Sequence, residues 1–155
     1  GEVFVIRAKA PTTPKTYNGN TKFEDGDLRY WSWCSQQGYA SGRVNKCLFD
    51  EQIPVDANGY YTLVLSRESD RPRNAINECG VSWLPIADVG DGTGDPDLSF
   101  LVLRNMLGRG EFKHAVQNIK SQETIQQDMG DYFPRARYTT VSSFETAVPC
   151  QVEKR

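Results

Sequence analysis

Residues 29 to 47, RYWSWCSQQGYASGRVNKC, hold the aromatic side chains best placed to bind a flat ligand. In an extended strand Trp31 and Trp33 share one face, because successive side chains point to opposite sides. Two indoles in line, about 7 Å apart at their backbones, could stack on sugar rings, with Tyr39 in the following polar turn as a third ring. The same alternation is more often found in a hydrophobic core, where each indole buries about 200 Å². The pattern therefore predicts either a core hairpin or a carbohydrate-stacking surface.

The chain contains four cysteines, which are Cys34, Cys47, Cys79 and Cys150. Their spacings match neither a zinc site with paired Cys-x-x-Cys motifs nor a haem-attachment motif. If residues 43–49 return antiparallel to the strand before them, Cys34 and Cys47 could meet, and Cys79 and Cys150 would then remain as the second pair. The even number favours disulfides over free thiols and indicates an oxidising compartment, although the connectivity stays open.

The acidic loop DVGDGTGDPD supplies the carboxylates of Asp88, Asp91, Asp95 and Asp97 among three glycines. Carboxylate oxygens are the ligands that hard cations such as Ca²⁺ prefer. The spacing departs from the EF-hand pattern because the final Glu is missing. The loop is therefore predicted to be either a calcium site of another kind or a plain surface loop, and no other cofactor is indicated.

His114 is the only histidine, which excludes metal centres built from two or three histidines. No Gly-x-Ser-x-Gly elbow accompanies it, so we expect a solvated histidine on a helix face rather than a member of a catalytic triad. In SRESDRPRN, Arg71 and Arg73 could bind an anion, or form an enzymatic pocket with Asp91. Solvated loop charges explain the same residues more simply. We assign no catalytic residue.

Composition and charge describe an ordinary globular chain. With 155 residues, 38% hydrophobic and 25% charged, it suits one domain spanning residues 1–155. The net charge is −2 and the basic residues are scattered, which argues against a nucleic-acid partner. No apolar run approaches the roughly 18 residues of a transmembrane helix, so we predict no membrane span.

Strand patterns dominate the first two thirds of the chain. Alternation or β-forming residues, bounded by turn signals such as Asn58-Gly59, occur at residues 3–8, 28–36, 43–49, 60–66, 80–84 and 98–104. Strands that recur with turns between them predict a mainly β fold, an antiparallel sandwich or barrel.

Helical signals come late in the chain. The apolar spacing over residues 110–120 predicts one short helix, and residues 121–131 predict a second, capped by Ser121 and ended near Gly130. The following residues, 131–145, are predicted to be extended. We therefore expect one or two short helices near the C-terminus.

The succession YWS, DANGYYTL, RPRN, WLP and LRNML is similar to the domain of unknown function 1214, usually found beside the domain of unknown function 1254. Over most of residues 2–140 the chain also resembles the C-terminal half of uncharacterised secreted bacterial proteins. The resemblance implies an exported, jelly-roll-like β-sandwich without established catalytic residues. It also implies that the chain is the C-terminal half of a longer two-part protein, unless a signal peptide has simply been removed.

A half taken from a two-part sandwich would leave strand edges or an apolar face uncovered, and such edges recruit other chains. We therefore expect a homo-oligomer or a partner β-domain. Together these observations predict a secreted or periplasmic, disulfide-stabilised β-sandwich that acts as a binding or structural module. The alternative is a carbohydrate-binding or carbohydrate-active jelly roll that uses Trp31, Trp33 and Tyr39.

Overall fold

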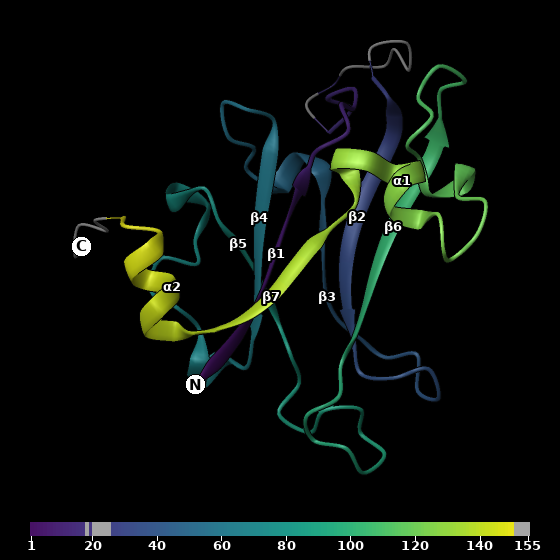
Figure 1. The fold of residues 1–155 in the computed structure, drawn as a ribbon. Coiled ribbons are helices and arrows are strands. Elements are labelled where there is room, and N and C mark those ends of the chain that lie inside the picture. Colours follow the sequence, from purple (N-terminus) through teal and green to yellow (C-terminus); the bar gives the residue numbers. More distant parts are fainter. Residues whose placement is uncertain (18, 20–25, 151–155) are drawn as a thin grey trace.

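The computed structural model describes residues 1–17, 19 and 26–150, whose strands form two facing sheets (Figure 1). Sheet A has the strand order β5-β4-β1-β7, formed by β1 (Glu2–Lys9), β4 (Tyr60–Ser66), β5 (Ser82–Pro85) and β7 (Arg135–Thr140). Sheet B has the order β3-β2-β6, formed by β2 (Leu28–Gln36), β3 (Val44–Phe49) and β6 (Phe100–Gly108). The predicted mainly β sandwich is confirmed.

One strand pair departs from the expected antiparallel arrangement. β4 and β5 are parallel, with Leu63 opposite Ser82 and Leu65 opposite Leu84. Parallel neighbours need a long crossover, and residues 67–81 supply it with two short 3-10 turns, η3 (Glu68–Asp70) and η4 (Asn77–Cys79). The remaining neighbours, β1 with β4 and β7, and β2 with β3 and β6, are antiparallel.

Two short α-helices lie near the C-terminus, α1 (Ile125–Met129) and α2 (Val141–Ala147). α1 lies within the second predicted helix and ends at Gly130, whose φ of 56° lies in the region that favours glycine. Its N-cap is Thr124 rather than Ser121, although the two hydroxyls contact each other at 3.3 Å. Among the described residues no helix has the length and apolar character needed to cross a membrane.

The helix predicted over residues 110–120 is wrong. Only the 3-10 turn η5 (Val116–Asn118) forms there, and its flanking residues Ala115 and Ile119 are extended. Polar contacts with β6 compete with the helix, because the side-chain oxygen of Asn105 accepts from the Val116 N–H at 3.0 Å. The apolar spacing instead reflects a loop that packs Phe112 and Ala115 into the core.

The extended conformation predicted over residues 131–145 forms in β7, but residues 141–145 belong to α2, so that part of the prediction is wrong. Thr140, the last residue of β7, caps the helix because its hydroxyl accepts from the Ser143 N–H at 3.1 Å. Phe144 is then buried against sheet A and is 1% exposed. Val141 and Val148 pack on the same cluster, but a seven-residue helix is too short for this apolar spacing to reveal it in the sequence.

Two hydrophobic clusters lie on the two sides of sheet A. The larger fills the space between the sheets and includes Trp31, Trp33, Tyr61, Leu63 and Leu84. The smaller lies on the outer side of sheet A, beneath α2, and includes Val3, Val5, Val64, Trp83 and Phe144. α2 accordingly lies on the side of sheet A that faces away from sheet B (Figure 1).

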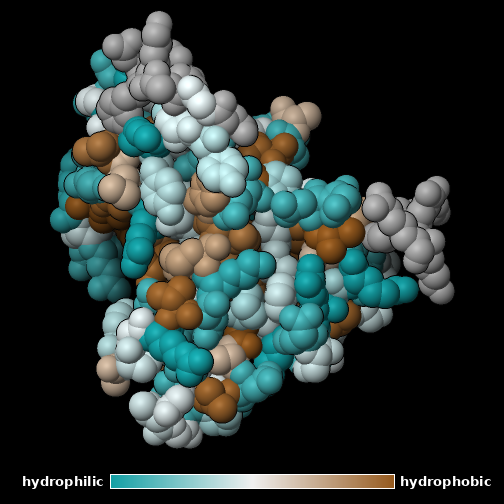
Figure 2. All heavy atoms as spheres, turned by 180° about the vertical axis from the view of Figure 1, so that it is seen from behind, coloured by the Kyte–Doolittle hydropathy of each residue, from teal (hydrophilic) through white to brown (hydrophobic). Residues whose placement is uncertain are grey.

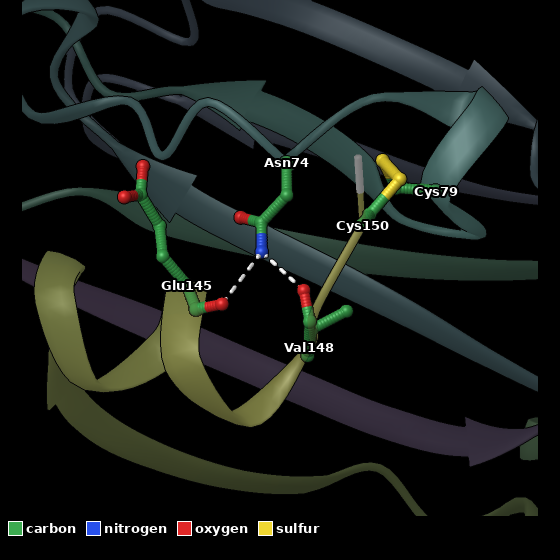
Figure 3. The surroundings of a disulfide bond; sticks show 5 residues. All are labelled: Asn74, Cys79, Glu145, Val148 and Cys150. Carbon is green, nitrogen blue, oxygen red and sulfur yellow. Dashed lines mark hydrogen bonds between the residues drawn. A yellow bond between two sulfur atoms is a disulfide. The ribbon is translucent and has the colours of Figure 1, made fainter. Parts of the chain in front are cut away.

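Two disulfides join the pairs that the sequence suggested. Cys34 and Cys47 are direct neighbours on β2 and β3, with their Cα atoms 4.1 Å apart. Cys79 and Cys150 join η4 to the segment after α2. Beside this second bridge, the buried side chain of Asn74 donates to the carbonyl oxygens of Glu145 and Val148 at the end of α2 (Figure 3). The C-terminal segment is therefore fastened covalently and by hydrogen bonds.

Candidate functional site

Trp31 and Trp33 point into the core between the sheets and are only 1% and 5% exposed. The Trp31 indole N–H donates to the carbonyl oxygen of Pro11 at 3.1 Å, and that of Trp33 donates to the hydroxyl of Tyr61 at 2.9 Å. Burial raises the pKa of Tyr61, so its phenol remains neutral while it accepts this bond. The core interpretation of the indoles is confirmed, and neither offers a face on which a sugar could stack.

Tyr39 lies apart from the two indoles. It is 84% exposed in the turn after β2, and its ring centroid lies 4.2 Å from that of Phe100. Phe100 pairs with Gln36, which has the strand parity opposite to that of Trp33, so Tyr39 packs on the other side of sheet B. The three residues proposed as a stacking surface do not form one surface.

The acidic loop is organised by its own hydrogen bonds. One carboxylate oxygen of Asp91 accepts from the N–H groups of Thr93, Gly94 and Asp95, and the other accepts from the Thr93 hydroxyl at 2.6 Å. The Thr93 hydroxyl, with these N–H groups, lowers the pKa of Asp91 to about 2. Asp97 pairs with Arg67 at 2.9 Å. The carboxylates of this loop, with Asp88 included, are not gathered into one ligand group.

The described ranges, 1–17, 19 and 26–150, hold no group of three or more His, Cys, Asp or Glu side chains arranged to bind a metal ion.

The two arginines of SRESDRPRN that were considered as an anion site, Arg71 and Arg73, each contact other residues of the protein. Arg71 lies 4.4 Å from the centre of the Trp83 ring and donates to the Ala75 carbonyl, and Arg73 pairs with Glu145 at 2.7 Å. Each has a different partner, so they do not converge with Asp91 on one pocket.

A different group of charged residues gathers on the outer face of sheet A. Along β1 this face changes from apolar at Val5, beside α2, to cationic at Arg7 and Lys9. β7 adds two more cations, because its register places Arg135 opposite Arg7 and Arg137 opposite Val5. Four cationic side chains therefore share one face of two paired strands.

A cavity of about 310 Å³ opens beside these residues, within the size range of small-molecule sites. We call it the arginine cavity. Besides the apolar Val5 and Ala136, the residues that line it are Arg7, Tyr60, Asp131, Phe133, Arg135 and Arg137. It thus combines three guanidinium groups and two aromatic rings with one carboxylate.

Arg7 is held in place from several sides. Its guanidinium pairs with Asp56, donates to the Thr62 hydroxyl at 3.0 Å, and lies 5.2 Å from the centre of the Tyr60 ring. The Tyr60 N–H, together with Arg7, lowers the pKa of Asp56 and keeps this carboxylate ionised. Arg7 therefore has a counter-charge and a fixed orientation.

Arg135 and Arg137 differ from Arg7 in this respect. Both side chains are exposed, and within the part of the chain that the structure describes, neither guanidinium has an ion pair or a hydrogen bond. Guanidinium groups bind carboxylates and phosphates through two parallel N–H donors. These two side chains are consequently available to an anion that enters the cavity.

A second cavity of about 460 Å³ adjoins the first, since Asp131 lines both. We call it the His114 cavity. Its charged and aromatic lining includes Lys9, Glu111, Lys113, His114, Asp131 and Tyr132. The short turn η6 (Gly130–Tyr132) contributes residues to both cavities.

His114 does not lie on a helix, as predicted, but in the loop before η5, where it is half-buried. Its Nδ1 lies 2.9 Å from the carbonyl oxygen of Asp128. Because a carbonyl only accepts, Nδ1 is the donor in this contact. The ring stacks on Tyr132 with centroids 5.4 Å apart, and Lys9 lies over the same tyrosine ring at 5.5 Å.

The sequence carries part of the signal for the cationic face. IRAK at residues 6–9 and RARY at residues 135–138 both place cations two residues apart, which puts them on one face of a strand. Counting basic residues along the chain makes them look scattered. That β1 and β7 are neighbours follows only from the fold, since the two strands are separated by most of the chain.

Fold and site together define a disulfide-stabilised β-sandwich domain with a cationic, aromatic-lined pocket on one sheet. No family model and no curated protein matches the chain. The solved structures include the crystal structure of an uncharacterised protein from Burkholderia cenocepacia that is similar, with 12% identity and a TM-score of 0.44. The match covers 92% of this chain and 27% of that one, so the chain spans well under half of that protein's length.

Proposed function

We propose that the protein is a secreted or periplasmic binding module that takes an anionic ligand, carrying a carboxylate or a group of similar charge, in the arginine cavity. The observation that carries the proposal is the placement of Arg135 directly opposite Arg7, with Arg137 beside them and no counter-charge on Arg135 or Arg137 among the described residues. Two disulfides support an oxidising compartment.

Electrostatics explains why this placement favours a ligand. Like charges directly opposite each other on paired strands are destabilising. Asp56 offsets the charge of Arg7 only, and the single carboxylate of Asp131 faces both cavities. A bound anion would relieve the remaining repulsion, and the apolar and aromatic walls at Val5, Tyr60 and Phe133 would strengthen its attraction by excluding water.

A structural role for the same arginines makes a different prediction. β7 is an edge strand of sheet A, and charged side chains on edge strands prevent pairing with other chains. If edge protection is their role, neutral substitutions of Arg135 and Arg137 would promote self-association of the protein and would leave the affinity for an anion unchanged. The cavity favours binding, because an edge that needs only protection does not require its arginines to line a hollow with aromatic rings.

Nuclear magnetic resonance titration with sodium glucuronate tests the proposal. We expect shifts of the β1 and β7 amides in the unsubstituted protein and in Arg104→Gln, which removes an exposed arginine from sheet B as a matched control. The double variant Arg135→Gln/Arg137→Gln should lose at least about tenfold in affinity, the loss of one or two charge-assisted contacts. Equal shifts in all three proteins, or no shifts in any, would contradict the proposal.

The predicted homo-oligomer or partner β-domain stays a prediction. Apolar residues reach the surface in several separate places among polar ones when the molecule is seen from behind (Figure 2). Exposed apolar side chains include Tyr17, Met106 and Leu107 at 80%, 51% and 64%. Light scattering at micromolar concentration tests this prediction, and a purely monomeric species would contradict a homo-oligomer.

The similarity to the domain of unknown function 1214 and the jelly-roll arrangement of the strands are likewise proposals. The support for them is the order of sequence motifs over most of residues 2–140 and the two facing sheets. An experimental structure of a member of that family tests both, since its strand order should match β5-β4-β1-β7 and β3-β2-β6.

A further inference from the structure

We propose, as an extension that rests on the function above, that the ligand is a glycan containing uronic-acid residues, and that it lies along both cavities at once. We call the joined cavities the cationic groove. It runs from Arg137 and Arg135, past Arg7 and Lys9 on β1, to Lys113.

The first argument is the continuity of the groove. Arg7 lines the arginine cavity and Lys9 lines the His114 cavity, although the two residues stand on the same face of β1 only about 7 Å apart. Asp131 lines both cavities. Each cavity by itself is large enough for a small molecule. A ligand that fills one cavity therefore reaches a residue that also lines the other, which suits a chain better than a single small ion.

The second argument is the alternation of charges and rings. Aromatic side chains lie between the cations, with Tyr60 beside Arg7 and Tyr132 beside Lys9. Pyranose rings present apolar C–H faces that pack on aromatic surfaces, and uronate residues add one carboxylate each, which guanidinium groups bind with two hydrogen bonds. Cations and aromatic rings thus stand side by side in the groove, where His114 and Lys9 already contact the Tyr132 ring.

The third argument is the position of Asp131 in the middle of the groove. Polyphosphate has no hydroxyl groups along its chain at neutral pH, so this carboxylate repels it without any compensating hydrogen bond. A uronate glycan also carries hydroxyl groups, which donate to carboxylates. Glu111 can accept in the same way at the far end, where it pairs with Arg109 at 3.7 Å. A peptide fits the groove less well than a glycan. Each peptide residue brings a backbone N–H that needs an acceptor, and the charged lining of the groove offers few acceptors.

Isothermal titration calorimetry with a galacturonate hexamer, monomeric galacturonate, maltohexaose, inorganic polyphosphate and poly-L-glutamate tests the inference. We expect the hexamer to bind at least about tenfold more tightly than the monomer, because its residues occupy linked subsites. Maltohexaose, polyphosphate and poly-L-glutamate should bind more weakly than the hexamer. A hexamer no tighter than the monomer, or poly-L-glutamate or polyphosphate binding as tightly as the hexamer, would overturn the inference while the anion site remains.

Two variants sharpen the result. Lys113→Gln should weaken the hexamer several-fold and leave the monomer unchanged, because Lys113 lines only the His114 cavity. Asp131→Asn should weaken the hexamer but strengthen polyphosphate, since it removes a repulsive charge and a hydroxyl acceptor together. Stronger binding of both ligands by Asp131→Asn would overturn the role of Asp131. If no anion binds at all, the proposed function itself fails.

Discussion

Arg7 and Arg135 are direct cross-strand neighbours on the outer face of sheet A, and of the two only Arg7 has a carboxylate partner among the described residues. A folded protein rarely gains from such a pair, because the two positive charges repel each other. The pair is therefore a measurable cost in the unliganded protein, and its removal gives the first prediction.

Arg135→Gln should raise the free energy of unfolding of the unliganded protein by about 0.2–1 kcal/mol, the size of cross-strand pair effects. The gain should shrink as salt is added, because salt screens exposed charges. Urea unfolding at low and high ionic strength measures both effects. Arg104→Gln on sheet B serves as the control, and an Arg135→Gln protein less stable than this control would contradict the argument.

The hydrogen bond between Trp33 and Tyr61 supports a second prediction. Tyr61→Phe removes the acceptor of a buried indole N–H, since Trp33 is 5% and Tyr61 is 2% exposed. A buried donor left without a partner costs about 1–3 kcal/mol, so urea unfolding should show a loss of that size. Tyr60→Phe is the matched control, as Tyr60 lies one residue away and only half-buried. Equal losses in the two variants would show that this bond contributes nothing.

Much of the sandwich could be predicted because its strands are locally encoded. Alternation in residues 28–36 placed Trp31 and Trp33 on one face, and the return of residues 43–49 brought Cys34 to Cys47. The helices were harder, because the packing of Phe144 on sheet A and the Thr140 cap decide α2, and neither is visible without the neighbouring strands.

The candidate site was missed for a related reason. The residues selected from the sequence stood close together in the chain, as in the 29–47 segment and the acidic loop at 88–97, and each group proved to serve local structure. The cationic groove joins residue 7 to residue 135 through strand pairing. Only the register of β1 and β7 reveals it, and that register depends on the whole sheet.

The two disulfides give a third prediction, because they close loops of very different length. Cys34 and Cys47 are separated by 13 residues, and Cys79 and Cys150 by 71. By the chain-entropy model these bridges contribute about 3 and about 4.4 kcal/mol. Cys79→Ala/Cys150→Ala should therefore destabilise the protein more than Cys34→Ala/Cys47→Ala in urea unfolding.

The contacts of α2 show how the prediction that Cys79–Cys150 contributes more than Cys34–Cys47 could fail. Asn74 and Arg73 already fasten the helix through Glu145, so α2 should stay in place when the Cys79–Cys150 bridge is removed. Hydrogen exchange of the α2 amides distinguishes the two effects. Rapid exchange confined to α2, with little change in global stability, would show that the bridge only holds the helix and does not restrict the unfolded chain.

The last prediction concerns the pH dependence of the acidic loop. The Thr93 hydroxyl and the loop N–H groups lower the pKa of Asp91 from 3.8 to about 2 in the folded protein. Because the folded value is the lower one, the stabilisation is fully present above the ordinary value and is lost as the pH falls from about 4 towards 2. Thr93→Ala removes the largest contribution, so the pKa of Asp91 should rise towards its ordinary value. Carbon-detected titration of the carboxyl group measures it, and Thr146→Ala on α2, which leaves this loop intact, is the control. An unchanged Asp91 titration in Thr93→Ala would show that the backbone N–H groups alone hold the carboxylate.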